Sequence, residues 1–291
     1  MIRIIPRLDI KGPNLVKGIR LEGLRVLGRP EQFARHYYEG GADELLYMDA
    51  VASLYGRNSL LDIVSRTARE VFIPLTVGGG LRTMDDIRAV LRAGADKVSV
   101  NTAAVRRPEL IREAARAFGS STVVVSVEAI RQPDGGYHAY TDCGREETGL
   151  DAVAWAVRAV ELGAGEILVT SVDREGTGKG FDLELVRRIA DAVSVPVVAS
   201  GGAGHARHVH EAVTTGGASA VCLASLLHYR AVREIPPADH GDEGNLEFLR
   251  RGTHSVAGAT LADVKSFLSE HGVDCRAVPG GARAATAGGP R

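Results

Sequence analysis

Short apolar runs alternate with amphipathic segments along most of the chain. The apolar runs are continuous and rich in Val, Ile and Leu, which is typical of parallel strands buried on both faces. They predict eight strands, at residues 2–9, 44–49, 74–77, 97–100, 122–127, 166–170, 196–199 and 220–223. Apolar positions with helical spacing predict helices at residues 30–40, 60–70, 84–93, 108–117, 150–162, 182–192, 205–214 and 261–271.

This order of elements favours a (β/α)8 TIM barrel, because eight strands with intervening helices over about 230 residues fit that fold. A doubly wound open sheet has the same alternation and is the alternative. An internal repeat favours the barrel, since residues 75–104 have a weaker copy at residues 197–226. Each copy contains a strand, a glycine turn, a helix and a second strand. A half-length repeat of four such units closes naturally into eight.

Both copies of the repeat carry glycines where a strand ends and a helix begins, at residues 78–80 and 201–202. Glycine lets backbone N–H groups approach an anion, and the N-terminus of a helix favours negative charge. Two such turns in one molecule predict two phosphate sites. A substrate with a phosphate at each end would use both.

Composition excludes some classes of function. The 291 residues include 35 basic and 36 acidic side chains, so no global field points to nucleic acid or to an acidic membrane surface. The three cysteines are widely spaced, which suits a reducing compartment. The sequence has no signal-peptide pattern at its start and no apolar stretch of membrane-spanning length. We therefore expect a cytoplasmic protein.

Two segments fall outside the repeat. Residues 231–258 contain Pro236 and Pro237 and a cluster of Asp, Gly and Glu, which predicts an exposed loop inserted before the last helix. Residues 279–291 have low complexity and are expected to be disordered. The remaining pattern predicts a single barrel domain over residues 1–278.

Polar side chains gather at the predicted carboxyl ends of the strands, where the chemistry of such barrels takes place. Asp9 ends the first strand and Glu128 follows the fifth, at matching points of the two halves. Two carboxylates across a barrel mouth can divide acid and base roles when their surroundings separate their pKa values. The structural alternative for each is a helix cap or a solvated loop residue. Their position beside two phosphate-type turns favours catalysis.

Several longer motifs resemble those of a known family, the cyclase subunits of imidazole glycerol phosphate synthase. The matching segments are IIPRLDIK (4–11), LVKG (15–18), DELLYMDAVAS (43–53), PLTVGGG (74–80), GADKVSVNTAA (94–104), FGSSTVVVSVEA (118–129), GAGEILVTSVDREGTGKGFD (163–182) and VVASGGAG (197–204). The similarity covers about residues 1–230 and the last helix. Taken together, these motifs are highly specific, and they imply a lyase of histidine biosynthesis.

The resemblance implies a reaction and a set of binding residues. In this family ammonia adds to a bis-phosphorylated ribulosyl aminoimidazole carboxamide, and the adduct splits into imidazole glycerol phosphate and an aminoimidazole carboxamide ribotide. The candidate substrate- and phosphate-binding residues are Lys17, Gly80, Asn101, Thr102, Thr170, Gly176, Gly202, Ala224 and Ser225. Gly80, Asn101 and Thr102 would hold one phosphate, and residues 176, 202, 224 and 225 the other. Neither a metal nor a cofactor is expected.

The remaining implied roles concern catalysis and closure of the site. Asp9 stands where the family has its first catalytic aspartate. Glu128 stands at the second, where the family has aspartate, and its side chain is longer by one methylene, roughly 1.5 Å. Lys17 matches a lysine of the family's mobile first loop and would act as a lid residue; a solvated loop lysine is the structural alternative.

Four charged residues lie at the predicted starts of strands, at the opposite end of the barrel: Arg3, Glu44, Lys97 and Glu166. Charges so close to an apolar interior must pair to offset the cost of desolvation, and structural closure of the barrel is one interpretation. They also match the family's charged ring, through which ammonia enters from a glutaminase. Because Cys143, Cys222 and Cys275 lie in no nucleophile motif, the resemblance implies that the glutaminase is a separate polypeptide in a heterodimer.

Two other hypotheses stay open. One is a related barrel that delivers ammonia to a sugar amidotransferase of surface-polysaccharide synthesis, with the charged ring kept and cyclase chemistry lost. The other is a catalytically silent barrel that only binds a partner protein. Asp9 favours the cyclase, whereas Glu128 permits the first alternative; the phosphate-type turns in both halves disfavour the second.

Overall fold

The structure is a computed structural model that describes residues 1–19, 22–50, 60–235, 256 and 258–278. Most of the loop expected at residues 231–258, and all of the tail expected at residues 279–291, lie outside the described residues. Those two expectations therefore stay predictions.

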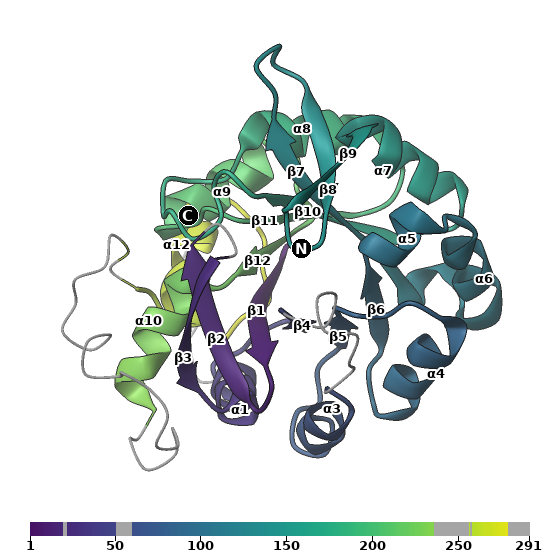
Figure 1. The fold of residues 1–291 in the computed structure, drawn as a ribbon. Helices are drawn as coiled ribbons and strands as arrows, with labels where there is room; N and C mark the ends of the chain where they lie inside the picture. Colours follow the sequence, from purple (N-terminus) through teal and green to yellow (C-terminus); the bar gives the residue numbers. More distant parts are fainter. Residues whose placement is uncertain (20–21, 51–59, 236–255, 257, 279–291) are drawn as a thin grey trace, which may run out of the picture.

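Eight parallel strands form a closed barrel (Figure 1). They pair in the order β10-β11-β12-β1-β4-β5-β6-β7, and the pairing of β7 with β10 closes the ring. The strands are β1 (Arg3–Lys11), β4 (Leu45–Asp49), β5 (Leu75–Gly78), β6 (Lys97–Val100), β7 (Val123–Arg131), β10 (Glu166–Ser171), β11 (Val197–Ser200) and β12 (Ala220–Leu223). The predicted TIM barrel is confirmed, and the open-sheet alternative is wrong.

Helices surround the barrel on its outside (Figure 1). They are α1 (Pro30–Glu39), α3 (Leu61–Thr67), α4 (Met84–Arg92), α5 (Thr102–Arg106), α6 (Glu109–Phe118), the 3-10 turn η1 (Ser120–Thr122), α7 (Ala152–Glu161), α8 (Leu183–Ala192), α9 (Ala206–Thr214), α10 (Ser225–Glu234) and α12 (Leu261–Glu270). Reciprocal capping boxes start two of them, with Thr83 and Asp86 at α4 and Thr260 and Asp263 at α12. Helix α10 was not predicted, and it contains residues 231–234, which were expected in the inserted loop.

The apolar side chains form two cores. The larger one lies between the strands and the helices. The smaller one lies inside the barrel and consists of Ile5, Leu46, Val124, Leu168, Val198, Ala220 and Cys222. Because successive side chains of a strand point to opposite faces, β1 directs Ile4 into the outer core and Ile5 into the barrel. By the same alternation Arg3, Arg7 and Asp9 share the inward face of β1 with Ile5.

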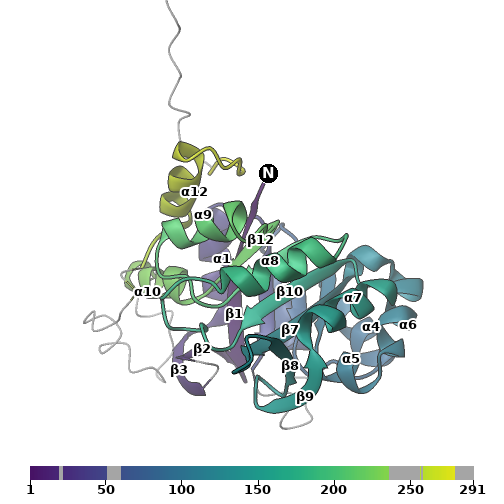
Figure 2. The ribbon, with the colours of Figure 1, turned by 90° about the horizontal axis from the view of Figure 1, so that it is seen from above.

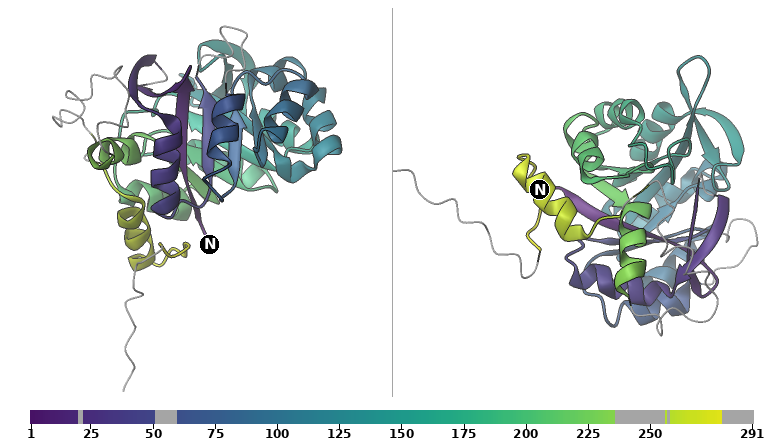
Figure 3. Two further views of the ribbon diagram at one scale, coloured as in Figure 1. Left: turned by 90° about the horizontal axis from the view of Figure 1, so that it is seen from below. Right: turned by 90° about the vertical axis from the view of Figure 1, so that its left-hand side faces the viewer.

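Two antiparallel hairpins follow strands at matching positions of the two halves. Strands β2 (Asn14–Ile19) and β3 (Glu22–Gly28) follow β1, and strands β8 (Tyr137–Thr141) and β9 (Glu146–Asp151) follow β7. Figures 2 and 3 show both hairpins at the end of the barrel opposite the N-terminus. Neither hairpin was predicted, and each stands beside the mouth where the strands end.

Candidate functional site

Both glycine turns at the mouth make backbone contacts that no other residue type would allow. Gly79, after β5, has φ +88°, and a Cβ atom there would lie 2.4 Å from the carbonyl oxygen of Asp49. Gly202, after β11, has φ +109°, and a Cβ atom there would lie 2.1 Å from the carbonyl oxygen of Gly180. Only glycine fits either position, so each turn keeps its backbone close to a neighbouring strand end or loop.

A cavity of about 260 Å³ opens beside the first glycine turn. Its lining includes the three residues expected to hold one phosphate, Gly80, Asn101 and Thr102. The Asn101 side-chain amide donates a hydrogen bond to the Tyr140 carbonyl oxygen at 3.1 Å. The Thr102 hydroxyl accepts one from the Asp142 backbone N–H, also at 3.1 Å. Strand β8 and the residue after it therefore fix this wall of the cavity.

The second glycine turn borders a much smaller cavity, of about 20 Å³. A space of that size holds roughly one water molecule. Its lining includes Gly176, Gly202, Ala224 and Ser225, the four residues expected to hold the other phosphate. The Ser225 hydroxyl is buried and has no hydrogen-bond partner within the described part of the chain. The residues of the second candidate subsite are thus assembled around a cavity much smaller than the first.

Lys17 and Glu175 form a buried ion pair beside this second cavity, which Glu175 lines. Lys17 lies on β2 and Glu175 in the connection between β10 and α8, and their residues are 4% and 3% exposed. Burial disfavours both charges, but the mutual attraction outweighs it, so the pKa of Lys17 is raised and the pKa of Glu175 is lowered. The expectation that Lys17 lies in a loop was wrong: it is a strand residue that ties the β2–β3 hairpin to the mouth.

Arg7 is a buried cation that connects β1 with β10 and β11. Its Nε donates a hydrogen bond to Asp9 Oδ1 at 2.9 Å, and its Nη1 lies 3.3 Å from both Thr170 Oγ1 and Ser200 Oγ. Burial acts to lower the pKa of Arg7, but the attraction of the Asp9, Glu175 and Glu128 carboxylates outweighs it, so the pKa lies above its ordinary value. Arg7 therefore remains ionised. In this structure the Thr170 hydroxyl is a hydrogen-bond partner of Arg7.

Glu128 lines the first cavity and has the carboxyl group best suited to proton transfer. Burial raises its pKa to about 7, although Arg7 and a 2.9 Å hydrogen bond from the Gly144 backbone N–H both act to lower it. Asp9 and Asp142 add to the increase through repulsion. A carboxyl group that titrates near neutrality can both accept and donate a proton at the working pH of most enzymes.

The raised pKa of Glu128 predicts a pH-dependent cost in stability. A folded-state pKa of about 7 against an ordinary value of 4.5 means that ionisation opposes folding. The stability contributed by the protonated form is fully present below pH 4.5 and is lost as the pH rises through 7. Across that range Glu128→Gln should gain about 3 kcal/mol relative to the natural chain. Denaturant unfolding of the variant and of the natural chain at pH 4.5 and pH 8 measures their difference in free energy of unfolding. If this difference is the same at both pH values, the raised pKa is contradicted.

The sequence predictions for the mouth missed two residues. Arg7 could have been found, because it stands two positions before Asp9 on one strand and so faces the same way. Glu175 had no such signal, since it lies in an irregular connection. Among the predicted residues, Asp9 and Thr170 bond to Arg7, which also lines the second cavity together with Gly176, Gly202, Ala224 and Ser225. Glu128 lines the first cavity together with Gly80, Asn101 and Thr102.

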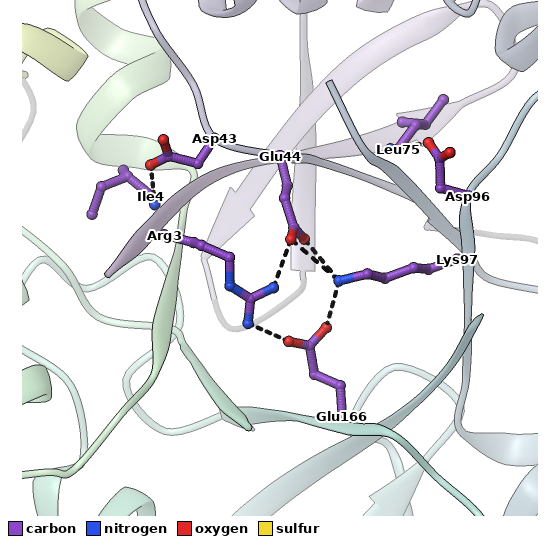
Figure 4. Close-up of polar contacts among 8 residues, drawn as sticks. All are labelled: Arg3, Ile4, Asp43, Glu44, Leu75, Asp96, Lys97 and Glu166. Carbon is purple, nitrogen blue, oxygen red and sulfur yellow. Dashed lines mark hydrogen bonds and ion pairs between the residues drawn. The ribbon is translucent and has the colours of Figure 1, made fainter. Parts of the chain in front are cut away.

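The four charged residues predicted at the other end of the barrel form a closed ring of ion pairs (Figure 4). Arg3 bonds to Glu44 at 2.6 Å and also to Glu166, and Lys97 lies 3.2 Å from each of the two glutamates. The ring contains two positive and two negative groups, so it carries no net charge. The four residues pair with one another, as the sequence predicted. A role of the ring in ammonia entry stays a proposal.

Other features limit the chemistry of the chain. None of the three cysteines forms a disulfide, and burial raises the pKa of Cys222 inside the barrel, which disfavours a reactive thiolate there. Among the helices that the structure describes, none is both long enough and apolar enough to span a membrane. The described residues also contain no cluster of three His, Cys, Asp or Glu side chains that could hold a metal ion.

Comparison with known proteins places the chain in a family. Residues 3–233 match the model of the histidine biosynthesis protein family. A relative from Legionella pneumophila, imidazole glycerol phosphate synthase subunit HisF, is 61% identical over 203 residues, or 70% of this chain and 96% of the relative. A protein of the same name from Methanopyrus kandleri is 51% identical over 245 residues, or 78% of this chain and 90% of the relative. The chain therefore belongs to the histidine biosynthesis protein family, in which it groups with the HisF subunits of imidazole glycerol phosphate synthase.

Proposed function

We propose that this chain is the cyclase subunit that uses ammonia to convert a bis-phosphorylated ribulosyl aminoimidazole carboxamide into imidazole glycerol phosphate and aminoimidazole carboxamide ribotide. The observation that carries the proposal is the organisation of the mouth. Glu128 lines one glycine-turn cavity, and Asp9 bonds to Arg7, which lines the other. A substrate held at both ends would thus present its middle to two ionisable carboxyl groups.

Each carboxyl group has a role that follows from its surroundings. Addition of ammonia to a carbonyl carbon moves a proton from nitrogen to oxygen, and the oxygen then leaves as water. The added nitrogen bonds to the amidine carbon and closes the imidazole ring. The bond from that carbon to the nitrogen of the aminoimidazole carboxamide breaks, and this leaving nitrogen takes up a proton. Glu128, with a pKa of about 7, can donate and accept these protons in turn. Asp9, paired with Arg7, is the second acid–base group and is held in one orientation by that contact.

The two phosphates would be bound mainly by backbone N–H groups, which explains why the turns need glycine. In the first subsite Arg82, Arg106 and Arg107 also line the cavity and add positive charge. In the second subsite, Ser225 is the first residue of α10 and its hydroxyl is unpaired within the described residues. Glu175 lines this cavity and pairs with Lys17, so a phosphate bound here would lie beside that ion pair.

The ammonia would come from a separate glutaminase subunit at the opposite end of the barrel. The ring of Arg3, Glu44, Lys97 and Glu166 lies there, and the small apolar core separates it from Arg7 and Asp9. Burial raises the pKa of both Cys222 and Cys275, which makes these thiols poor nucleophiles and supports a partner that carries the glutaminase nucleophile. We expect gel filtration of the chain with this glutaminase to give a one-to-one complex; separate elution of the two proteins contradicts the assignment.

One steady-state assay tests the proposed activity. Purified chain is given the ribulosyl substrate and an ammonium salt at alkaline pH, and loss of substrate absorbance is followed. We expect ammonia-dependent turnover without the partner, because all the proposed cyclase residues lie on this chain. The same assay with glutamine and the glutaminase should give turnover that depends on the complex.

The size of the second cavity favours one other candidate function. A barrel that delivers ammonia to another enzyme needs the charged ring but no open second phosphate subsite, and this subsite has room for roughly one water molecule. In that case the chain would stimulate glutamine hydrolysis by its partner and would leave the ribulosyl substrate unchanged with either nitrogen source. Turnover with ammonium excludes this candidate.

A further inference from the structure

We propose that Arg7 is a positioning residue for the Asp9–Glu128 pair, a role that rests on the proposed cyclase function of those two groups. The first argument is its fixed geometry. The guanidinium group is held at Nε by Asp9 and at Nη1 by hydroxyl groups of β10 and β11. Arg7 is 5% exposed, so its side chain has little freedom to leave these contacts.

The backbone of Arg7 is anchored as well. His228, on α10, lies with its Nε2 2.9 Å from the Arg7 carbonyl oxygen and its Nδ1 2.6 Å from the Tyr37 hydroxyl. Burial lowers the pKa of His228 to about 3, so the ring is neutral. Because a carbonyl oxygen only accepts, Nε2 donates to Arg7 and Nδ1 accepts from Tyr37. A buried network from two helices thereby fixes the segment of β1 that carries both Arg7 and Asp9.

Charge gives the second argument. Three carboxyl groups act on the Arg7 cation, from Asp9, Glu128 and Glu175. Lys17 is paired with Glu175, although its charge also acts on Asp9. Arg7 is the cation that bonds directly to Asp9 and also acts on Glu128. The charged groups that act on Glu128 or share its cavity are Arg7 and Asp9 on β1, Asp49 at the end of β4, Arg82 after β5, Arg106 and Arg107 at α5, and Asp142 after β8. Arg106 forms an ion pair with Asp142, with 2.9 Å between Arg106 Nη2 and Asp142 Oδ2.

These contacts explain what Arg7 contributes. It sets the rotamer of Asp9 through a charge-assisted hydrogen bond, and its field keeps a fraction of Glu128 ionised near neutral pH despite complete burial. Without this cation, Glu128 and Asp9 would repel each other in a site of low dielectric constant. The pair would then hold one proton too tightly to exchange it during the reaction.

The test measures the titration of Glu128 directly, by NMR of a chain with ¹³C-labelled glutamate carboxyl groups. The Glu128 signal is assigned by its loss in Glu128→Gln. We expect Arg7→Gln to raise the Glu128 midpoint by about one unit and Arg7→Lys to keep it near its natural value, because lysine retains the charge. Arg158→Gln, which removes an exposed arginine of α7 that pairs with Glu161 and lines neither cavity, should leave the midpoint within a few tenths of a unit.

The same variants give a kinetic readout. Arg7→Gln should lower kcat about a hundredfold and should move to higher pH the limb of the rate profile that Glu128→Gln abolishes. Arg7→Lys should restore the position of that limb. An unchanged Glu128 midpoint in folded Arg7→Gln overturns the proposal. Absence of turnover by the natural chain, with the midpoint shift still present, overturns the cyclase function and leaves the electrostatic role of Arg7 intact.

Discussion

Asp9→Asn is expected to lower the kcat of ammonia-dependent turnover by about a thousandfold. Asparagine keeps the size of the side chain and can still accept the 2.9 Å hydrogen bond from Arg7 Nε. It cannot take up or release a proton, and it leaves the Arg7 charge without its nearest partner. Steady-state kinetics should therefore show a large fall in kcat with little change in the KM for the ribulosyl substrate.

Asp173→Asn is the matched control for this change. Asp173 follows β10 near the mouth, but it is exposed and its carboxylate accepts a 3.0 Å hydrogen bond from the Arg131 backbone N–H. We expect its kcat to stay within about a factor of two of the natural chain, since a surface contact of this kind contributes little. Equal losses in the two variants would show that a general perturbation of the mouth, rather than proton transfer by Asp9, limits the rate.

Glu166→Gln is expected to cause the largest loss of stability. Glu166 is 6% exposed and pairs with both Arg3 and Lys97, so its neutralisation leaves two cations facing one glutamate. Breaking such a buried arrangement should lower the free energy of unfolding by about 2–3 kcal/mol. Urea denaturation at neutral pH measures the loss, and high salt should reduce it only slightly because the ring is largely shielded from solvent.

Glu184→Gln is the control for the ring. Glu184 also pairs with two arginines, Arg131 and Arg188, but its side chain on α8 is 41% exposed, so its loss should change stability by less than about 0.5 kcal/mol. A Glu166→Gln variant as stable as this control would contradict the structural role of the ring. If the ring also admits ammonia, Glu166→Gln should impair glutamine-dependent turnover more than turnover with ammonium.

The strands of the barrel and the charged ring could be predicted from the sequence because each leaves a strong local signal. Buried parallel strands require continuous apolar runs, and the runs at residues 123–125 and 197–199 have this form. The ring residues interrupt that pattern at strand starts, where a charge near the core must find a partner. Arg3 and Glu166 were therefore conspicuous before their contact was known.

The hairpins, helix α10 and the Lys17–Glu175 pair could not be predicted in the same way. Strand β9 is mostly exposed, so it shows no alternation of apolar and polar residues. Lys17 and Glu175 are 158 positions apart, and only the folded chain brings β2 against the β10–α8 connection. The two glycine turns predicted two phosphate sites, but they gave no signal that the cavity at the second turn is much smaller than the cavity at the first.

Isotope transfer shows whether this chain incorporates ammonia into an imidazole ring. The purified chain is incubated with the ribulosyl substrate and ¹⁵N-ammonium, and the products are separated by mass spectrometry. We expect one ¹⁵N atom in imidazole glycerol phosphate and none in the aminoimidazole carboxamide ribotide, with formation of both products lost in Asp9→Asn. Recovery of unchanged substrate with the natural chain, in the presence and absence of the glutaminase, would contradict the proposed cyclase function.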